Sequence, residues 1–461
     1  MGAHGRRVHA RLLIMIINGT LKNTVVFSLL VFADQAWSAD LVQILRDAFA
    51  NDAQYASARA TRDAGMEALP QGLAGLLPTI SASAFTQMND LDLSFRGALP
   101  PSKREGNSNA ISFALTQPVF NWNNMMVYKE AGFRAAQAEA QFSQATQDLI
   151  VRVSQAYFDV LASQDSLAFI QAQKTAISEQ LAQAKRNFEV GTATITDTHE
   201  AQARYDLATS QEIAAQSDLE IKKRALQQII GKFPERLVPI KPSVQINPPK
   251  PATMEEWASA AELQSFPVRT QEAAAEIASR EIDRIRAGHL PTLNLIGNYG
   301  QSSQGVATTG ISNVASDVTN RNIGLQLSIP LYAGGNVSSQ VRQSIANREK
   351  ARQDLEFSRR SAALSARQAF LGVTNGIAQV KALEAALTSS QSALDSNKLG
   401  YEVGVRINID VLNAQQQVFS TKRDLSKARY DTVVNGLKLK AAAGSLSDTD
   451  VEEVNRLLGA D

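Results

Sequence analysis

The sequence of 461 residues has no cysteine, few aromatic residues and almost no net charge. Without cysteine the chain can form no disulfide, no cysteine-ligated metal site and no lipid anchor on an N-terminal cysteine. The formal net charge of +1 gives no reason to expect a nucleic-acid partner. Aromatic residues make up 6% of the chain, while alanine, glutamine and serine are abundant. This composition suits closely packed helices better than a large globular core.

Sequence motifs of catalysis are also missing. No Walker-type GxxxxGK[ST], GxSxG, GxGxxG or HExxH pattern occurs in the chain. His199 follows Asp197 by two residues but has no second metal-ligating residue at a suitable spacing. We therefore expect no enzyme activity, no catalytic or metal site and no cofactor.

The first 39 residues have the features of a secretory signal peptide. Basic residues precede a short apolar stretch at 25–33, and small residues follow at 36–39. The apolar stretch is too short to span a bilayer as a helix. We therefore expect export, with cleavage after Ser38 or Ala39. No later stretch approaches the ~18 apolar residues that a transmembrane helix needs.

The chain contains two copies of one plan, separated by a constant offset of 213 residues. Several unrelated landmarks share this offset, which indicates duplication rather than low complexity. The recurring landmarks are Leu77-Pro78-Thr79 with 290–292, Glu189-Val190-Gly191 with 402–404, Asp197 with Asp410, and Gly231 with Gly444.

Each copy has the same order of expected elements: a leading helix, a strand, a polar loop, a second strand and two long helices. Proline is absent from 119–233 and from 331–461, and an interior proline costs a helix about 3 kcal/mol. Both regions are therefore free to be continuously helical. We expect a signal peptide at 1–39, a first repeat at 40–233, a linker at 234–251, a second repeat at 252–446 and a C-terminal tail at 447–461.

Between residues 149 and 188, apolar residues recur at alternating steps of four and three. This spacing is typical of a coiled-coil seam. A continuous helix over 123–190 would be about 100 Å long at 1.5 Å per residue. Gly191 lets the chain reverse, and a second helix is expected over 194–231 with a glycine C-cap. The second copy repeats the pattern more loosely, so each copy predicts a long helical hairpin.

The expected strands alternate at period two. Segments 111–116 and 322–329 place aliphatic residues on one face and small or polar residues on the other. A soluble, half-buried sheet would look similar, but export and the lack of another core favour a membrane barrel. The polar segments 87–109 and 300–320 are expected as loops at its mouth. Four strands cannot close a barrel, since the smallest have about eight, so the chain must oligomerise, with two, three or more subunits.

Strand pairs that lead into long helical hairpins, duplicated in one exported chain, resemble the TolC family of outer-membrane efflux proteins. The resemblance is carried by segments 288–293, 329–335, 401–413 and 428–431. It implies a mainly α fold with membrane β: a homotrimer with a twelve-stranded β-barrel in outer-membrane lipid, continued by an α-helical coiled-coil tunnel. Most of the mass would lie in the periplasm.

The same resemblance implies a function. The chain would be the passive exit duct of a tripartite export system, for type I protein secretion, multidrug efflux or both. Its partners would be a periplasmic adaptor and an inner-membrane pump of the ABC or RND type. The alternatives are a periplasmic coiled-coil adaptor and a structural rod protein without pore activity. An adaptor would need only one hairpin, and a rod would not need alternating strands.

The resemblance also implies roles for residues near the hairpin ends. Asp410 would form a carboxylate ring at the pore constriction, where it would attract cations. Asn413 stands where the family pattern has a second aspartate, so cation selectivity should be weaker. The adaptor-docking tips would be the turns Val190-Gly191-Thr192 and Val403-Gly404-Val405.

Gating contacts are implied as well. Tyr401 and Arg406 look like residues of an inner helix that bond to Asp197 and Thr196 of a neighbouring outer helix. Such charge-assisted hydrogen bonds contribute about 1.5–3 kcal/mol each. Apart from the resemblance, an arginine and an aspartate near a helix end are more often a solvated surface pair that contributes little.

Overall fold

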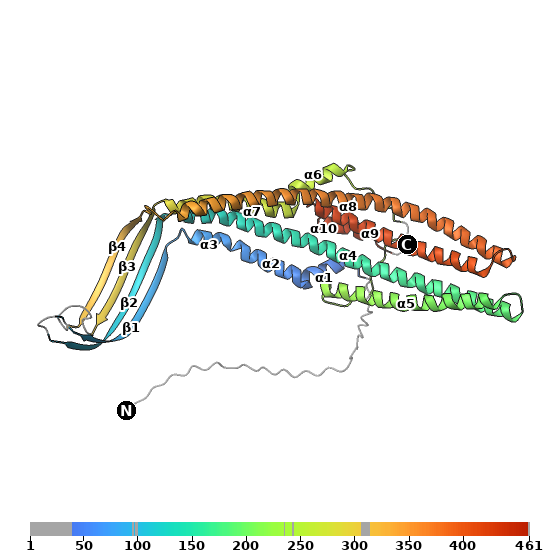
Figure 1. Cartoon of the computed structure of the whole chain (residues 1–461), viewed down its shortest axis with the longest axis horizontal. Coiled ribbons are helices and arrows are strands. Elements are labelled where there is room, and N and C mark those ends of the chain that lie inside the picture. The colour runs from blue at the N-terminus through green and yellow to red at the C-terminus, as the bar shows by residue number, and fades with distance from the viewer. Residues whose placement is uncertain are drawn as a thin grey trace, which may run out of the picture. The chain divides into compact units, whose positions relative to one another are not determined.

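A computed structural model describes residues 39–94, 96, 100–234, 236–241, 244–305 and 314–459. The expected signal peptide lies outside these residues, apart from Ala39. The described elements follow the same order twice (Figure 1). The first series is α1 (Leu41–Asn51), α2 (Ala53–Met66), α3 (Ala68–Ala74), β1 (Thr79–Leu93), β2 (Ser102–Phe120), α4 (Trp122–Glu189) and α5 (Ile195–Ile230). The second is α6 (Met254–Gln264), α7 (Phe266–Arg286), a short 3-10 helix (Ala287–His289), β3 (Thr292–Gln304), β4 (Ser316–Ser328), α8 (Asn336–Glu402) and α9 (Asn408–Ala442), followed by α10 (Asp448–Asn455).

The leading helix of each repeat is interrupted, whereas the sequence predicted one helix there. Asp52 ends α1 and caps α2, because its carboxylate accepts a hydrogen bond from the Tyr55 N–H at 2.6 Å. Short polar side chains compete with the helical backbone in this way and so favour caps over helix interiors. Ser265 separates α6 from α7 in the second repeat, where Pro267 fits the first turn of α7.

The long helices confirm the predicted hairpins. Helix α4 has 68 residues and α8 has 67, which makes each about 100 Å long. Helix α5 ends at Gly231 in the left-handed conformation, with φ of 74°. No described helix is both long enough and apolar enough to cross a membrane. Eight positions of the seam expected between residues 149 and 188 are buried in α4: Leu149, Val153, Val160, Ser163, Ile170, Ile177, Leu181 and Ala184.

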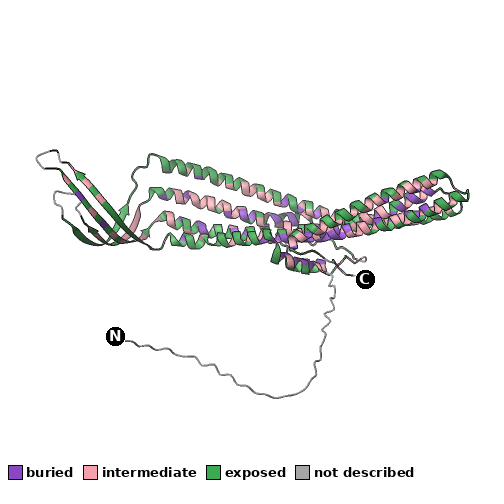
Figure 2. Cartoon of the chain, turned by 90° about the horizontal axis from the view of Figure 1, so that it is seen from below, coloured by how far each residue is buried: buried purple, intermediate pink, exposed green. Residues whose placement is uncertain are grey.

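The two hairpins lie side by side. Helices α8, α9, α4 and α5 succeed one another in that order, with α9 packed against α4 (Figure 1). At mid-height the aromatic rings of Phe158 and Tyr430 stack across this junction at 5.6 Å. Figure 2 shows buried residues along the helices where the hairpins meet and mostly exposed residues over the sheet. The row of four helices leaves α5 and α8 as its two flanks.

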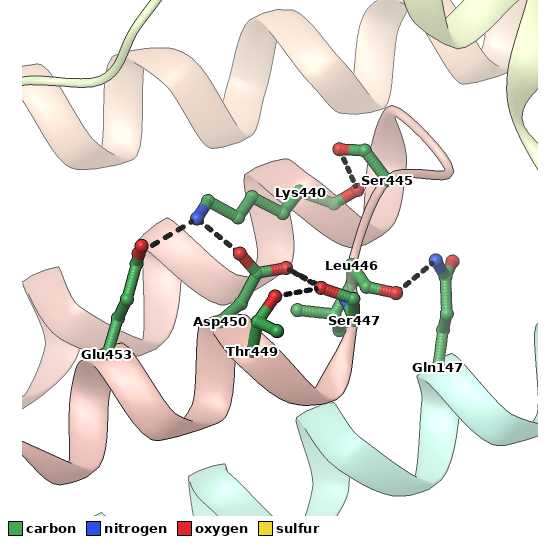
Figure 3. A network of polar contacts seen from close by, with 8 residues as sticks. All are labelled: Gln147, Lys440, Ser445, Leu446, Ser447, Thr449, Asp450 and Glu453. Carbon is green, nitrogen blue, oxygen red and sulfur yellow. Dashed lines mark hydrogen bonds and ion pairs between the residues drawn. The ribbon is translucent and has the colours of Figure 1, made fainter.

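The segment after α9 is folded against the hairpins. Val451 and Leu458 belong to the main core, which also contains Leu41 of α1 and Tyr157 of α4. Lys440 of α9 donates to Asp450 of α10 at 2.6 Å, and Gln147 of α4 donates to the Leu446 carbonyl at 3.1 Å (Figure 3). These contacts, together with the capping box at Ser447, fix α10 beside the middle of the hairpins.

The four strands form one antiparallel sheet in the order β1-β2-β3-β4. Cross-strand register places most of the large apolar side chains on one face, and all four strands contribute to it, while Phe85, Ile296 and Val318 lie on the other face. The apolar face is exposed: Ile80 and Ile323, at opposite edges, are 74% and 76% exposed. The other face is largely polar, with hydrogen bonds such as Ser83 to Ser112 at 2.8 Å. The apolar face contains Ile80, Ile111, Phe113, Leu115, Leu293, Leu295, Tyr299, Ile323, Leu325 and Leu327.

The expected loops at 87–109 and 300–320 are wrong over much of their length. The β1–β2 ladder continues from Gln87 and Ser108 to the pair Leu93 and Ser102, and β3 and β4 continue to Gln304 and Ser316. Polar residues occupy both faces there, so the alternation that marks a strand disappears from the sequence. Backbone hydrogen bonds nonetheless continue the ladder, because they do not depend on side-chain polarity.

Candidate functional site at the hairpin tips

The two hairpins reverse direction through turns of the same design. In the outer hairpin (α4 and α5), the Asn187 carbonyl accepts hydrogen bonds from the N–H groups of residues 192 and 193. In the inner hairpin (α8 and α9), the Gly400 carbonyl accepts from residues 405 and 406. Gly191 and Gly404 have φ of 77° and 78°, the left-handed conformation that glycine adopts without strain. The duplication therefore extends to individual hydrogen bonds of the tips.

The expected docking turns are highly exposed and apolar. Val190 is 72% exposed, Val403 is 65% exposed and Val405 is 79% exposed. Gly191, Thr192 and Gly404 are also exposed. Exposed apolar side chains gathered at one end of a structure are typical of an interaction surface.

Asp197 and Asp410 occupy equivalent places, in the first turn of α5 and of α9. A carboxylate is favourable there because the helix N-terminus carries a partial positive charge. Asp197 completes a capping box with Thr194, whose N–H and hydroxyl donate to its carboxylate at 3.0 and 2.9 Å. Thr196 is exposed next to it. Within one chain, the carboxylate of Asp197 therefore stabilises its own helix start.

Asp410 has no such cap to complete, because Ile407, the N-cap residue of α9, forms no side-chain cap. Its carboxylate instead lies 3.6 Å from the guanidinium of Arg406, one turn earlier. The side chain of Asp410 is 34% exposed and that of Arg406 is 58% exposed. Gly400 leaves room for Arg406, since a Cβ at position 400 would lie 2.7 Å from the arginine Cγ. The predicted gating arginine and constriction aspartate are thus neighbours in the same chain.

Tyr401 joins the two hairpins. Its hydroxyl oxygen accepts a hydrogen bond from the Asn187 side-chain amide at 3.2 Å. Tyr401 also packs on the cluster of Leu394, Val411 and Val418 between α8 and α9. The partner predicted from the sequence, Asp197 of a neighbouring subunit, stays a prediction.

A further polar contact near the tips was not predicted from the sequence. Arg204 of α5 donates to the Asn413 side-chain oxygen and to that of Gln416, each at 2.8 Å. Arg204 and Asn413 are 209 residues apart, and no local pattern links them. The only signal available was the duplicated register, which places α5 and α9 in equivalent hairpins. The side-chain oxygen of Asn413 is therefore hydrogen-bonded to an arginine of the outer hairpin.

Asp410, Arg406 and Arg204 form a group of charged side chains near the free ends of both hairpins. Asp410 supplies one negative charge and Arg406 a positive charge 3.6 Å from it, and Arg204 supplies a second positive charge where it donates to Asn413. The groups are partly exposed, so they can act on an ion or a solute that passes them.

Comparison with known proteins matches the repeat. The pattern of the family described as "Outer membrane efflux protein" matches residues 44–232 and again residues 257–445. The two matched stretches are offset by the 213 residues found in the sequence. They contain every residue of the two hairpin tips described above.

Individual relatives cover nearly the whole chain. It is 33% identical over 421 residues to the outer membrane protein TolC of Vibrio cholerae, which covers 91% of this chain and 94% of that protein. It is 30% identical over 430 residues to the alkaline protease secretion protein AprF of Pseudomonas aeruginosa, with coverage of 92% and 89%. The solved structure of the CmeC outer membrane channel of Campylobacter jejuni is similar in fold, with a TM-score of 0.75 at 17% identity, over 91% of this chain and 90% of that one.

Proposed function

The chain belongs to the outer membrane efflux protein family, and we propose that it is the outer-membrane exit duct of a tripartite export system. One observation carries this proposal: an exposed apolar sheet face continues over four strands, and the same chain extends from that sheet into two hairpins about 100 Å long. An apolar face of this kind suits lipid, and the helices suit the periplasm. The relatives are outer membrane channels, and we expect no hydrolytic activity from the chain itself.

The duct requires several copies of the chain. Within the described residues, β1 and β4 each pair on one side only, and long unpaired strand edges favour association with another strand. Three copies would give a closed barrel of twelve strands in outer-membrane lipid. We therefore propose a homotrimer in which β4 of one subunit pairs with β1 of the next.

The helical flanks support the same assembly. Helix α5 has an exposed stripe at alternating steps of four and three, which we call the α5 seam. Helix α8 has a matching exposed stripe, the α8 seam. Such spacing is typical of helices that pack as coiled coils, and neither seam is buried within one chain. The α5 seam consists of Ala203, Leu207, Ser210, Ala214, Ser217 and Ile221, and the α8 seam of Leu371, Asn375, Ala378, Ala382, Ala385, Ser389, Ser392, Ser396 and Leu399.

In such a ring the tips would gather around one axis. Asp410 would then contribute one carboxylate from each subunit to a ring of three at the constriction. The positive charge of Arg406 would weaken the attraction of this ring for cations, and Asn413 would provide no second acidic ring. Tyr401 and Arg406 would hold the tip closed through Asp197 and Thr196 of the neighbouring subunit. The exposed turns at 190–192 and 403–405 would bind a periplasmic adaptor, and an inner-membrane ABC or RND-type pump would supply the energy.

The relative AprF is named for alkaline protease secretion, so we propose that proteins exported by a type I system are among the cargo, alongside small toxic molecules. Neither the adaptor nor the rod interpretation explains a duplicated hairpin together with an apolar sheet. Outer-membrane fractions should contain the chain as a trimer that dissociates only on heating. The purified trimer should conduct ions in planar bilayers. Recovery as a monomer in the soluble periplasmic fraction would refute the proposal.

A further inference from the structure

Few polar contacts join the two hairpins near their free ends. Closer to the tips than Asp165, the described residues make only two such connections: Asn187 with Tyr401, and Arg204 with Asn413 and Gln416. At Asp165 and farther from the tips, Ser426 and Tyr430 donate to Asp165, and Lys438 donates to Gln155. Relative movement of the hairpins at their free ends therefore has to break these two connections.

The Arg204 connection is the more extensive of the two. Its guanidinium uses one nitrogen for each acceptor, and both distances are 2.8 Å. Asn413 and Gln416 are three residues apart on α9, so they lie on the same helix face. The planar guanidinium holds its donors in a fixed fork. Two acceptors at this spacing therefore fix both the distance and the rotation of α9 relative to α5.

Packing beside the fork makes the contact specific. Ile177 of α4, Ala208 of α5 and Leu412 of α9 form one buried cluster, and Leu412 directly precedes Asn413. Arg204 lines the edge of this three-helix junction. The fork therefore closes the polar rim of a small apolar contact, and separation of α9 from α5 would expose that contact to water.

We propose that Arg204 is a clamp within each subunit, which holds the inner hairpin against the outer hairpin while the tip is closed. The Arg204 clamp rests on the proposed function, in which the inner hairpins move to open a duct. It differs from the contacts expected between subunits, because both of its sides belong to one chain. It also gives Asn413 a role: an uncharged acceptor lets the fork release, whereas a carboxylate would hold Arg204 more tightly.

The decisive variant is Arg204→Met, which keeps a long side chain and removes every donor. Arg224→Met is the matched control, because Arg224 lies on the same helix and donates only to Glu220 and Gln227 of that helix. The chain has no cysteine, so spin labels can be placed at Val190→Cys and Val403→Cys, one on each tip. The distance between these labels reports hairpin separation in the purified trimer.

We expect Arg204→Met to broaden and lengthen the distance distribution and to raise closed-state conductance several-fold, with Arg224→Met unchanged. Asn413→Asp should narrow the distribution and lower conductance, but only while Arg204 is present. An unchanged tip distance in Arg204→Met would overturn the clamp. A wild-type trimer that conducts no ions would instead refute the proposed duct, and the tip distances would still decide whether Arg204 holds the hairpins together.

Discussion

The Tyr401 hydroxyl of α8 accepts a hydrogen bond from the Asn187 side chain of α4 at 3.2 Å. The backbone carbonyl of the same asparagine accepts the two N–H groups that close the outer tip. One residue thus forms the turn of the outer hairpin and contacts the last turn of the inner helix. Asn187 therefore links the turn of the outer hairpin to the end of α8.

The double variant Arg406→Ser with Tyr401→Phe should open the tip. Charge-assisted hydrogen bonds contribute about 1.5–3 kcal/mol each, and a trimer would lose every contact three times. A change of about 5.5 kcal/mol takes an equilibrium from 1:99 to 99:1, so a mostly closed duct would become mostly open. Single-channel recordings should show far larger conductance, and the cells should admit large antibiotics.

Arg360→Ser provides the control for this experiment. Arg360 lies on the same helix as Tyr401 and forms a pair with Glu356 at 2.8 Å, one turn away, as Arg406 does with Asp410. It should leave conductance unchanged. The thermal stability of the double variant should also remain close to that of the wild type, since the sheet and the buried seams are untouched. Unchanged conductance in a correctly assembled double variant would show that the closing contacts lie elsewhere.

Asp410→Asn should weaken the preference for cations and reduce block by multivalent cations. The fall in cation preference should be larger than the loss of the Asp410 charge alone would cause, because the positive charge of Arg406, 3.6 Å away, would then be unpaired. Asp431→Asn is the matched control: Asp431 is also on α9 and pairs with Lys427 one turn earlier, at 2.6 Å. Reversal potentials measured across a salt gradient test both variants. Equal ion selectivity in the wild type, Asp410→Asn and Asp431→Asn would show that Asp410 does not line the pore.

The mature chain should begin at Ala39. Its N–H donates to the Arg236 carbonyl at 2.8 Å and its carbonyl accepts from the Val238 N–H at 3.4 Å, so residue 39 is part of the folded structure. Cleavage after Ser38 keeps both contacts, whereas cleavage after Ala39 removes them. Mass spectrometry of outer-membrane material would decide, and an intact N-terminus at Met1 would contradict export by a cleaved signal.

Much of the fold could be predicted because its determinants are local or repeated. Long proline-free segments with a regular apolar spacing predict the helices of the hairpins. Gly191 and Gly231 mark the positions where the backbone has to adopt the left-handed conformation. The breaks at Asp52 and Ser265 were missed, since a single polar residue does not distinguish a cap from an exposed helical position. Strand ends were missed as well, because polar residues occupy both faces there.

Some residues of the candidate site could likewise be predicted from the sequence, and one could not. Asp410, Tyr401 and Arg406 stand in a segment that resembles the family, so the sequence could indicate them. Arg204 could not be found, because its acceptors lie more than 200 residues away and an isolated arginine on a helix usually points to solvent. Which side chains meet across two hairpins depends on the rotation of each helix about its own axis. The apolar periodicity of a sequence does not define this rotation accurately enough to predict an individual hydrogen bond.

Gly376→Ala should destabilise the inner hairpin. A Cβ at position 376 would lie 2.4 Å from the Thr432 hydroxyl oxygen and 3.2 Å from two of its carbon atoms. Thr432 is buried and its hydroxyl donates to the Ala428 carbonyl, so it has little freedom to move. Overpacking of this kind costs about 1–3 kcal/mol. The temperature of heat dissociation should fall.

Gly436→Ala is the control, because a Cβ there meets nothing within 4 Å. Helix propensity alone should then stabilise the protein by roughly 0.5–1 kcal/mol. Combining Gly376→Ala with Thr432→Ala should restore most of the lost stability, since the second change removes the clashing hydroxyl. A destabilised double variant would mean that the close approach of α8 and α9 is not the cause.

Glu130 of α4 makes stability depend on pH. Its side chain is 1% exposed and faces α7, where Arg284 lies 3.9 Å away and Glu281 is close by; Arg134 of its own helix lies at 3.5 Å. Burial, followed by the negative charge of Glu281, raises the pKa of Glu130 from 4.5 to about 7, against the opposing effect of the two arginines. Glu281 has its pKa lowered, mainly by the hydrogen bond from Arg284.

These opposite shifts predict opposite effects of two similar substitutions. The folded state binds a proton at Glu130 more tightly than the unfolded state does, so the stability it contributes is present at low pH and is lost as the pH rises through about 7. Glu130→Gln stays neutral, and it should match the wild type at pH ~5 but be more stable at pH ~8, by a few kcal/mol per subunit. Glu281→Gln should instead lose stability at pH ~8, because a depressed pKa stabilises the ionised form. Heat dissociation measured across this pH range checks both. Parallel curves for Glu130→Gln and the wild type would show that Glu130 is ionised throughout.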